Sequence, residues 1–400
     1  MVPDTPTISC NSTQTQHTIQ MKRRLECIPI LHVRGTHYNI GRAIGQTFKS
    51  MIQEMLDSWP YFNDHIMKCF LQEDGKRIYE NSLKLCKAKF PDLVDEIRGM
   101  ADGCNLPFEK LFLLNIDSMI TDKDESVVPM RGATGCTSII CNKEEVLLGH
   151  TEDAMCEILN NCYIISAEIM DSSGRLIEKF TTFSYAAHLM GYTMGFNEHG
   201  MVYSVNTLFP SIHKNGTPRA FIARAILGAK SFDSLLDILK DCGHGISDGM
   251  SLNVHFAKDE EPRRMFYNIE VMPPSPSSSE EIPESLLSIL TVNSGESSVH
   301  CNKYLRFNAK EQSLPVAVST NRQLTLERHP EPSGLSDIKF MLSDQSDKNF
   351  PVYICDEMHT KLSHIKTVAV GVFDMMGKTW SIYLGKPTES EPVAVLPLNF

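Results

Sequence analysis

The sequence contains no Cys-x-x-Cys pair, although 12 of its 400 residues are cysteine. Closely spaced cysteine pairs are typical of structural zinc sites, and disulfide scaffolds are short chains far richer in cysteine. We therefore expect no metal and no cofactor. We also expect free thiols, which are typical of a reducing, cytoplasmic compartment.

Long apolar stretches and an excess of positive charge are missing as well. No run approaches the roughly 20 apolar residues of a membrane-spanning helix. The first twenty residues are polar and lack the apolar core of a signal peptide. Acidic residues (49) outnumber basic residues (38), giving a net charge of −11. This balance disfavours nucleic acid and anionic membrane as partners and tolerates a small cationic amine.

The most informative feature that is present is the dipeptide Gly135-Cys136, directly before an apolar, β-branched run. If the bond between them breaks, Cys136 becomes an N-terminal residue that carries both a thiol nucleophile and its own amine base. An α-amine has a pKa of roughly 7.7–8.0 and can accept the thiol proton near neutral pH. Glycine suits the upstream side because it lacks a Cβ. The alternative is a buried cysteine that opens a strand.

The surrounding sequence favours the first interpretation. Residues 121–134 are polar and charged and contain a proline and a glycine, as expected of an exposed, cleavable connector. Downstream, 137–141 and 146–150 predict two strands joined by a turn at 142–145. This hairpin would return Glu152 and Asp153 to the strand end where Cys136 begins.

The rest of the chain divides into segments with different sequence patterns. Residues 1–25 are expected to be a disordered extension, and 26–135 a mostly helical N-terminal chain whose last helix spans 108–119. Residues 136–400 are predicted to form mainly strands, interrupted by a pair of helices at 218–227 and 232–240. A Pro/Ser/Glu-rich segment at 272–287 predicts a solvated loop.

Several strings resemble a known family. The pattern Gly-Cys-Thr-x-x-x-Cys, a hairpin and then Gly-x-x-x-Asp is similar to the isopenicillin N acyltransferase-type N-terminal-nucleophile hydrolases. The similarity runs from about Cys27 to the C-terminus and is closest to the Tan-type N-β-alanyl-dopamine hydrolases. It rests on four longer strings: Gly149-His150-Thr151-Glu152-Asp153-Ala154, Gly191-Tyr192-Thr193-Met194-Gly195-Phe196-Asn197, His300-Cys301-Asn302-Lys303-Tyr304-Leu305-Arg306 and Leu342-Ser343-Asp344-Gln345-Ser346-Asp347.

The resemblance implies an α+β fold, the four-layer αββα sandwich, and a set of site residues. Cys136 is the implied nucleophile, and Asn302 the side-chain donor of an oxyanion hole. Asp153 is implied to support cleavage and to orient the new amine, and Asn206 to lie near the nucleophile. Each has a structural alternative: a turn asparagine, a structural carboxylate or a strand-end cap.

Further candidates are weaker. Glu152 and Glu157 are two carboxylates close together in the sequence and could bind a substrate ammonium, although two ordinary surface carboxylates would give the same pattern. Tyr192 and Phe196 could line an aromatic leaving-group pocket, but strand aromatics are usually core residues. The family's arginine before the penultimate strands is missing at 362–367. Lys366, Arg322 and Arg306 are the cationic candidates to replace it.

The function expected from this resemblance is amide hydrolysis by a self-cleaving enzyme. The chain would cut itself at Gly135–Cys136 into two chains that stay associated, and would then hydrolyse N-β-alanyl-dopamine or β-alanyl-histamine through a thioester on Cys136. Three alternatives stay open. They are an acyltransferase that passes the acyl group to an amine or thiol, a peptidase whose only substrate is itself, and an uncleaved binding protein.

Overall fold

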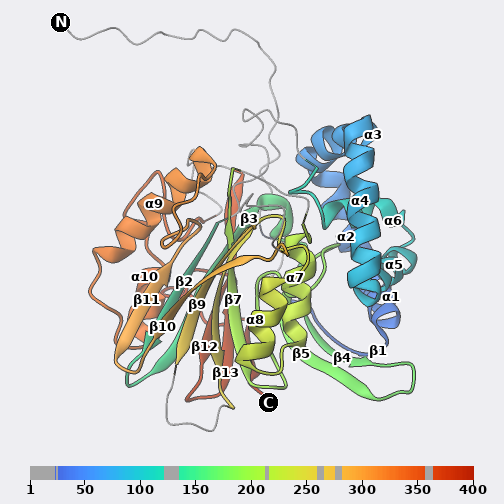
Figure 1. Ribbon diagram of the computed structural model, residues 1–400. Coiled ribbons are helices and arrows are strands. Elements are labelled where there is room, and N and C mark those ends of the chain that lie inside the picture. The colour runs from blue at the N-terminus through green and yellow to red at the C-terminus, as the bar shows by residue number, and fades with distance from the viewer. Residues whose placement is uncertain are drawn as a thin grey trace, which may run out of the picture.

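The computed structural model describes residues 23, 26–120, 135–211, 216–258, 265–274, 282–355 and 364–400. In these ranges the chain forms two β-sheets that lie face to face, with helices on both outer faces (Figure 1). This is the αββα order of layers, so the predicted α+β class is confirmed. The predicted connector at 121–134 and almost all of the predicted extension at 1–25 lie outside the described residues.

The larger sheet contains eight strands among the described residues, and its only parallel pair there is β1 with β4. In spatial order the strands are β1 (Ile30–Gly35), β4 (Cys162–Met170), β5 (Leu176–Tyr185), β6 (Met194–Asn197), β7 (Met201–Leu208), β8 (Gly249–Phe256), β9 (Phe266–Met272) and β10 (Leu286–Val292). The middle of the loop predicted at 272–287 lies outside the described residues, while its two ends belong to β9 and β10.

The smaller sheet contains six strands within the same ranges, and it carries the candidate nucleophile. In spatial order they are β11 (Glu296–His300), β2 (Gly135–Asn142), β3 (Val146–Met155), β12 (Ile365–Asp374), β13 (Thr379–Tyr383) and β14 (Ala394–Pro397). The predicted hairpin is confirmed as β2 and β3.

Helices cover the outer face of each sheet. Over the larger sheet lie α1 (His37–Thr47), α2 (Lys49–Ser58), η1 (Phe62–Ile66), α3 (Met67–Leu71), α4 (Glu73–Lys89), α5 (Pro91–Cys104), α6 (Phe108–Leu114), α7 (Arg219–Ala225), η4 (Ile226–Gly228) and α8 (Phe232–Lys240). Over the smaller sheet lie α9 (Ser313–Glu327) and α10 (Leu335–Leu342), and a 3-10 turn, η3 (Cys156–Ile158), follows β3.

Close glycine contacts fix the packing of the N-terminal helices. A Cβ added to Gly41 of α1 would lie 1.9 Å from the backbone oxygen of Glu96, and one added to Gly99 of α5 would lie 2.0 Å from that of Tyr38. Each helix therefore uses glycine to let the other backbone approach. The sequence pattern had indicated this close contact for Gly41.

The predicted helix at 108–119 is shorter in the structure, where α6 ends at Leu114. The side-chain amide of Asn115 donates to the backbone oxygens of Leu111, at 2.8 Å, and Ala187, at 3.3 Å. Asn115 therefore shares the Leu111 carbonyl between its side chain and its own backbone N–H, which lies 3.4 Å away, and ties the end of α6 to the turn after β5.

The two sheets bury each other's inner faces. Every residue of β2, β3, β7 and β8 is buried. Polar side chains on these strands are therefore enclosed between layers, where each one needs a partner. No helix in the described ranges is long and apolar enough to cross a membrane.

Candidate active site

The β2–β3 ladder places the candidate nucleophile directly opposite two acidic residues. Cys136 pairs with Glu152 and Gly135 with Asp153, as the hairpin had predicted. The Cys136 thiol donates to Oε2 of Glu152 at 3.7 Å. Directly opposed residues in an antiparallel pair have close Cβ atoms, so this contact follows from the strand register.

Asn302, two residues after β11, lies on the other side of Cys136. Its Oδ1 accepts from the backbone nitrogen of Cys136 at 2.7 Å, and its Nδ2 donates to the backbone oxygen of Thr207 at 3.0 Å. Its Oδ1, which also accepts from Arg322, is therefore the atom that faces Cys136, while its amide nitrogen is directed to the strand β7.

Arg322 of α9 is the cation of this site. It donates to the backbone oxygen of Cys136 at 3.0 Å, to Oγ1 of Thr137 at 2.9 Å and to Oδ1 of Asn302 at 2.6 Å. Lys366 donates to the backbone oxygen of Cys355 instead. Arg306 binds Ser288 and the backbone of Asn268.

Asp153 is fully buried between Arg322 and Thr367. The Thr367 hydroxyl donates to its Oδ1 at 2.7 Å, and a guanidinium nitrogen of Arg322 lies 3.5 Å from Oδ2. Burial raises the pKa of Asp153 from its ordinary 3.8 to about 7, and Arg322 opposes this shift without cancelling it. The carboxyl therefore changes charge near neutral pH.

Glu152 is held from two sides and anchors a polar chain between the sheets. The Tyr185 hydroxyl donates to its Oε1, and His150 Nε2 lies 2.9 Å from its Oε2. His150 Nδ1 is in turn 2.9 Å from the hydroxyl of Ser138, which donates to Oδ1 of Asn206 at 2.9 Å. Asn206 therefore reaches Cys136 only through intermediate side chains.

The thiol of Cys136 is enclosed in the uncut chain, with 2 % of the residue's surface exposed. Burial raises its pKa well above the usual range, and the carboxylates of Glu152 and Asp153 add to the rise, while Arg322 and the backbone of Thr207 oppose it. The thiol is thus protonated at neutral pH and requires a base before it can attack.

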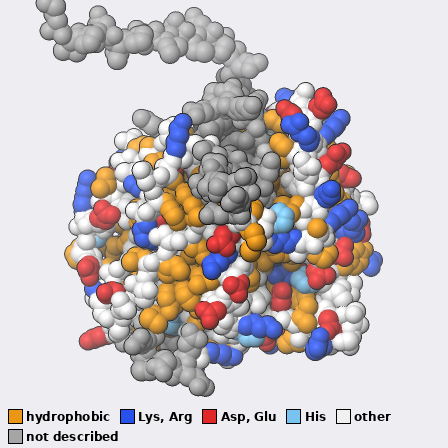
Figure 2. Space-filling view, in the orientation of Figure 1, with side chains coloured by type: hydrophobic (Ala, Val, Ile, Leu, Met, Phe, Trp, Pro, Cys, Tyr) orange, Lys and Arg blue, Asp and Glu red, His pale blue; other side chains and the backbone are white. Residues whose placement is uncertain are grey.

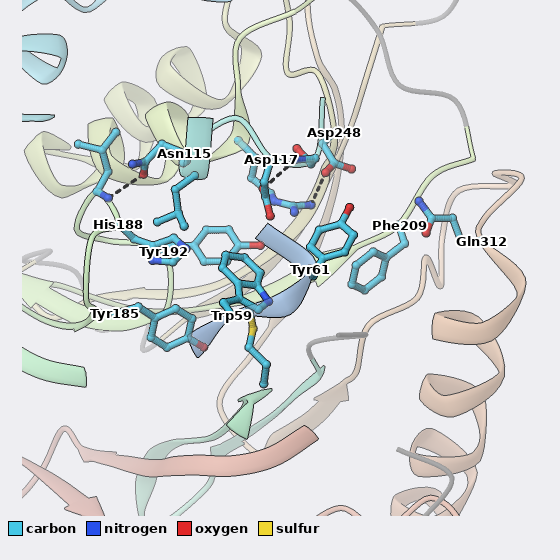
Figure 3. Close-up of a pocket in the computed structure, with 16 residues that line it drawn as sticks. Trp59, Tyr61, Asn115, Asp117, Tyr185, His188, Tyr192, Phe209, Asp248 and Gln312 are labelled. Atoms are coloured by element: carbon cyan, nitrogen blue, oxygen red, sulfur yellow. Dashed lines mark hydrogen bonds and ion pairs between the residues drawn. The ribbon is translucent and has the colours of Figure 1, made fainter. Parts of the chain in front are cut away.

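Two tyrosines connect this cluster to a pocket, which Figure 3 shows with its lining residues. Tyr185, which binds Glu152, and Tyr192, which lies 2.6 Å from the Thr207 hydroxyl, both line it. Its wall comes from the N-terminal helical region and from the sheets and helices after Cys136; the lining includes Trp59, Tyr61, Asn115, Asp117, Phe209, Arg219 and Asp248.

Two of the sequence candidates lie apart from this pocket and the cysteine. Glu157 is in η3 and accepts from the thiol of Cys156 at 3.6 Å. Phe196 of β6 packs edge-on against Trp380 and Phe400. Neither contributes to the lining of the pocket beside Cys136.

Three side chains of the cluster could act as metal ligands. Cys136 Sγ, one nitrogen of His150 and one carboxylate oxygen of Glu152 lie within 4.8 Å of one another. All three are already joined by the contacts between sulfur, carboxylate and imidazole. Hydrogen bonding within the cluster thus accounts for the arrangement without an ion.

A cysteine at the start of β2, with an asparagine, an arginine and two carboxylates around it, is the arrangement expected of an N-terminal-nucleophile amide hydrolase. The family model described as acyl-coenzyme A:6-aminopenicillanic acid acyl-transferase matches residues 141–389. The chain belongs to this family, which confirms the resemblance found in its sequence.

One curated relative is similar over nearly the whole chain. It is the beta-alanyl-dopamine/carcinine hydrolase of Drosophila melanogaster, 37% identical over 390 residues, which cover 94% of this chain and 98% of the relative.

Two solved structures are more distant. A mutant conjugated bile acid hydrolase from Clostridium perfringens is 10% identical with a TM-score of 0.35, over 66% of this chain and 92% of that one. Penicillin V acylase from Agrobacterium tumefaciens is 10% identical with a TM-score of 0.29, over 62% and 82%.

Proposed function

We propose that this protein cleaves itself between Gly135 and Cys136 and then hydrolyses N-β-alanyl amines, with β-alanyl-dopamine and the β-alanyl amide of histamine as the expected substrates. The observation that carries the proposal is the contact of Cys136 with Glu152, Asn302 and Arg322 at the start of β2. The relative that acts, by its name, on β-alanyl-dopamine and carcinine supports the substrate class.

Self-cleavage begins with the thiol, whose proton passes to the carboxylate of Glu152. The sulfur attacks the carbonyl carbon of Gly135. A C–S bond forms, the C–N bond to Cys136 breaks, and the freed nitrogen takes the proton and becomes an α-amine. Water then hydrolyses the thioester, which releases the upstream chain as a carboxylic acid and restores the thiol.

Turnover uses the same sulfur with the new amine as its base. The α-amine accepts the thiol proton, and the sulfur attacks the amide carbon of the substrate. The leaving amine takes the proton as the C–N bond breaks. Water activated by the α-amine then releases β-alanine. The proposed role of the Asn302 amide group is to donate to the oxyanion in both steps, which is worth about 10²–10³ in rate for one donor.

Different residues around the sulfur are proposed to bind the two ends of the substrate. Glu152 binds the ammonium of the β-alanyl group, because its carboxylate lies next to the sulfur. The pocket behind Tyr185 and Tyr192 takes the aromatic amine. Asp153 holds Arg322, and Asn206 holds Ser138 and through it His150. No role is proposed for Glu157 or Phe196.

The two cleavage products, 1–135 (the extension 1–25 with the mostly helical chain 26–135) and 136–400, are proposed to remain associated in the cytoplasm. A fully buried ion pair joins Glu96 of α5 to Arg224 of α7 across the cut. The eleven cysteines of the described ranges are all free, as in a reducing compartment. Basic and acidic side chains are interspersed over the face in Figure 2, which supports a small-molecule rather than a nucleic-acid partner.

The direct test is release of β-alanine and dopamine from β-alanyl-dopamine, followed by chromatography. Equal amounts of both products are expected, and the absence of turnover by fully cleaved protein would refute the proposal. Acyl transfer is the second candidate, because the matching family is described as acyl-transferases. A β-alanyl adduct that grows with added amine or thiol at the expense of free β-alanine would establish it.

A further inference from the structure

Gly135 lies against the two charged groups of the site rather than in open space. A Cβ built on it would lie 2.8 Å from Nη2 and 3.2 Å from the central carbon of the Arg322 guanidinium, and 3.3 Å from Oδ2 of Asp153. The position that precedes the nucleophile therefore has room for a CH₂ group and not for a substituted carbon.

The guanidinium cannot easily move to make room. It is 2 % exposed, and its two terminal nitrogens are bound to the backbone oxygen of Cys136, to Thr137, to Asn302 and to Asp153. Displacing it would break several charge-assisted hydrogen bonds in a buried site, and these are stronger than neutral ones. The group that limits the space at Gly135 is thus a guanidinium held in place by hydrogen bonds, and not the mobile end of a flexible side chain.

The self-cleavage thioester and the turnover thioester share one sulfur. In the first, the acyl group is –NH–CH₂–C(=O)–, from Gly135; in the second it is H₃N⁺–CH₂–CH₂–C(=O)–, from the substrate. Both have an unsubstituted CH₂ next to the carbonyl. In both, water adds to the carbonyl carbon, the C–S bond breaks and the sulfur regains its proton.

We propose that the space occupied by Gly135 in the uncut chain is the acyl subsite of the mature enzyme, and that Arg322 and Asp153 restrict it to acyl groups whose α-carbon is an unbranched CH₂. This inference rests on the proposed function and names its acyl class. Glycyl and β-alanyl groups fit. Acyl groups of L-α-amino acids, which carry a side chain on that carbon, do not.

The contact at Gly135 explains how such an enzyme spares ordinary peptides. Every peptide bond except those after glycine presents a carbonyl whose α-carbon is substituted. The same limit that requires glycine at the cleavage site would therefore exclude almost all protein-derived amides. Selectivity for the ammonium position comes from Glu152, and selectivity for the unbranched carbon comes from Arg322 and Asp153.

The test uses cleaved wild-type enzyme and dopamine amides that differ by one methyl group. The first comparison sets β-alanyl-dopamine against each of the two enantiomers of 3-amino-2-methylpropanoyl-dopamine, and the second sets glycyl-dopamine against L-alanyl-dopamine. Overpacking by one methyl group predicts kcat/KM roughly ten- to a hundredfold lower for L-alanyl-dopamine and for the enantiomer of matching hand. Equal kcat/KM values for all amides within each comparison would overturn the inference.

The uncut chain gives an independent readout that needs no substrate. Gly135→Ala should lengthen the half-life of self-cleavage by a similar factor in a protein that is soluble and melts cooperatively. Cleavage at the wild-type rate would contradict the steric premise. If β-alanyl-dopamine itself is not hydrolysed, the proposed function fails, whereas hydrolysis of the methylated and unmethylated amides at equal rates removes only the acyl subsite.

Discussion

Glu152→Gln is the substitution that most sharply tests how the site recognises β-alanine. The residue is 2 % exposed, its Oε2 accepts from the Cys136 thiol at 3.7 Å, and Tyr185 and His150 fix its position. Glutamine keeps the size and removes the charge. Truncating one partner of a buried, hydrogen-bonded charge pair costs about 2–5 kcal/mol. At 1.36 kcal/mol per tenfold, kcat/KM should fall roughly 30- to 5,000-fold.

The assay compares β-alanyl-dopamine with butanoyl-dopamine, in which a methyl group replaces the ammonium. Self-cleavage is bypassed by co-expressing residues 1–135 with a second chain in which an initiator methionine precedes Cys136 and is removed in the cell. We expect Glu152→Gln to lower kcat/KM for the β-alanyl amide and to leave the butanoyl amide nearly unchanged. Glu157→Gln, which changes a carboxylate away from the cluster, is the matched control and should alter neither value.

Equal losses for the two amides would refute ammonium recognition and would assign Glu152 to the thiol alone. No loss for either amide would remove Glu152 from turnover altogether. In the single-chain protein the same variant should also cleave itself more slowly, because the thiol then lacks its carboxylate acceptor.

Three further predictions concern catalysis, pH dependence and assembly. Asn302→Ala should give a folded enzyme whose kcat is about 10²–10³ lower with KM little changed, measured on cleaved protein; an unchanged kcat would remove Asn302 from the oxyanion hole. The pKa of Asp153 is raised to about 7, so the folded state binds more protons than the unfolded state between pH 4 and 7. The contribution of Asp153 to the free energy of unfolding therefore decreases as the pH rises through this range. In a Cys136→Ala background, urea unfolding should show Asp153→Asn gaining stability relative to Asp153 over that range, and a constant difference would contradict the shift. Arg224→Met should lower the unfolding free energy by about 3–5 kcal/mol, because it removes the guanidinium from the fully buried Glu96 and leaves that carboxylate only its contact with His37; the two cleaved chains should then separate at lower urea. An unchanged midpoint would count against this contact as a link between them.

The β2–β3 hairpin could be predicted from sequence because its signals are local. Apolar and β-branched residues on both sides of a polar turn set the two strands, and the register of a short hairpin then follows from the turn. Hence the local sequence was enough to bring Glu152 and Asp153 to the strand end that holds Gly135 and Cys136, where the β2–β3 ladder has them.

The position of Arg322 could not be inferred in the same way. The helix α9 that carries it was not predicted, and its apolar and polar residues show little segregation to opposite faces. Arg322 lies 186 residues from Cys136 along the chain, and only the stacking of α9 on the smaller sheet brings them together. The sequence offered Lys366 as a substitute for the missing arginine, with Arg322, Arg306 or no cation as the alternatives, and tertiary packing places Arg322 beside Cys136.

The positions of the strand ends likewise decide which of the weaker candidates lie near the site. Glu152 and Glu157 are five positions apart in one acidic segment, but β3 ends at Met155. The strand holds Glu152 between the sheets, and the turn after it directs Glu157 to Cys156. Tyr192 and Phe196 differ in the same way, because the first precedes β6 beside the pocket and the second lies within the strand.

The most direct measurement is the N-terminal residue of the larger fragment of purified protein, read by sequencing together with the intact mass. The account predicts Cys136 at that position in the wild type and a single uncut chain for Cys136→Ala. A fragment that begins at any other residue, or complete cutting of the alanine variant, would contradict self-cleavage by this thiol.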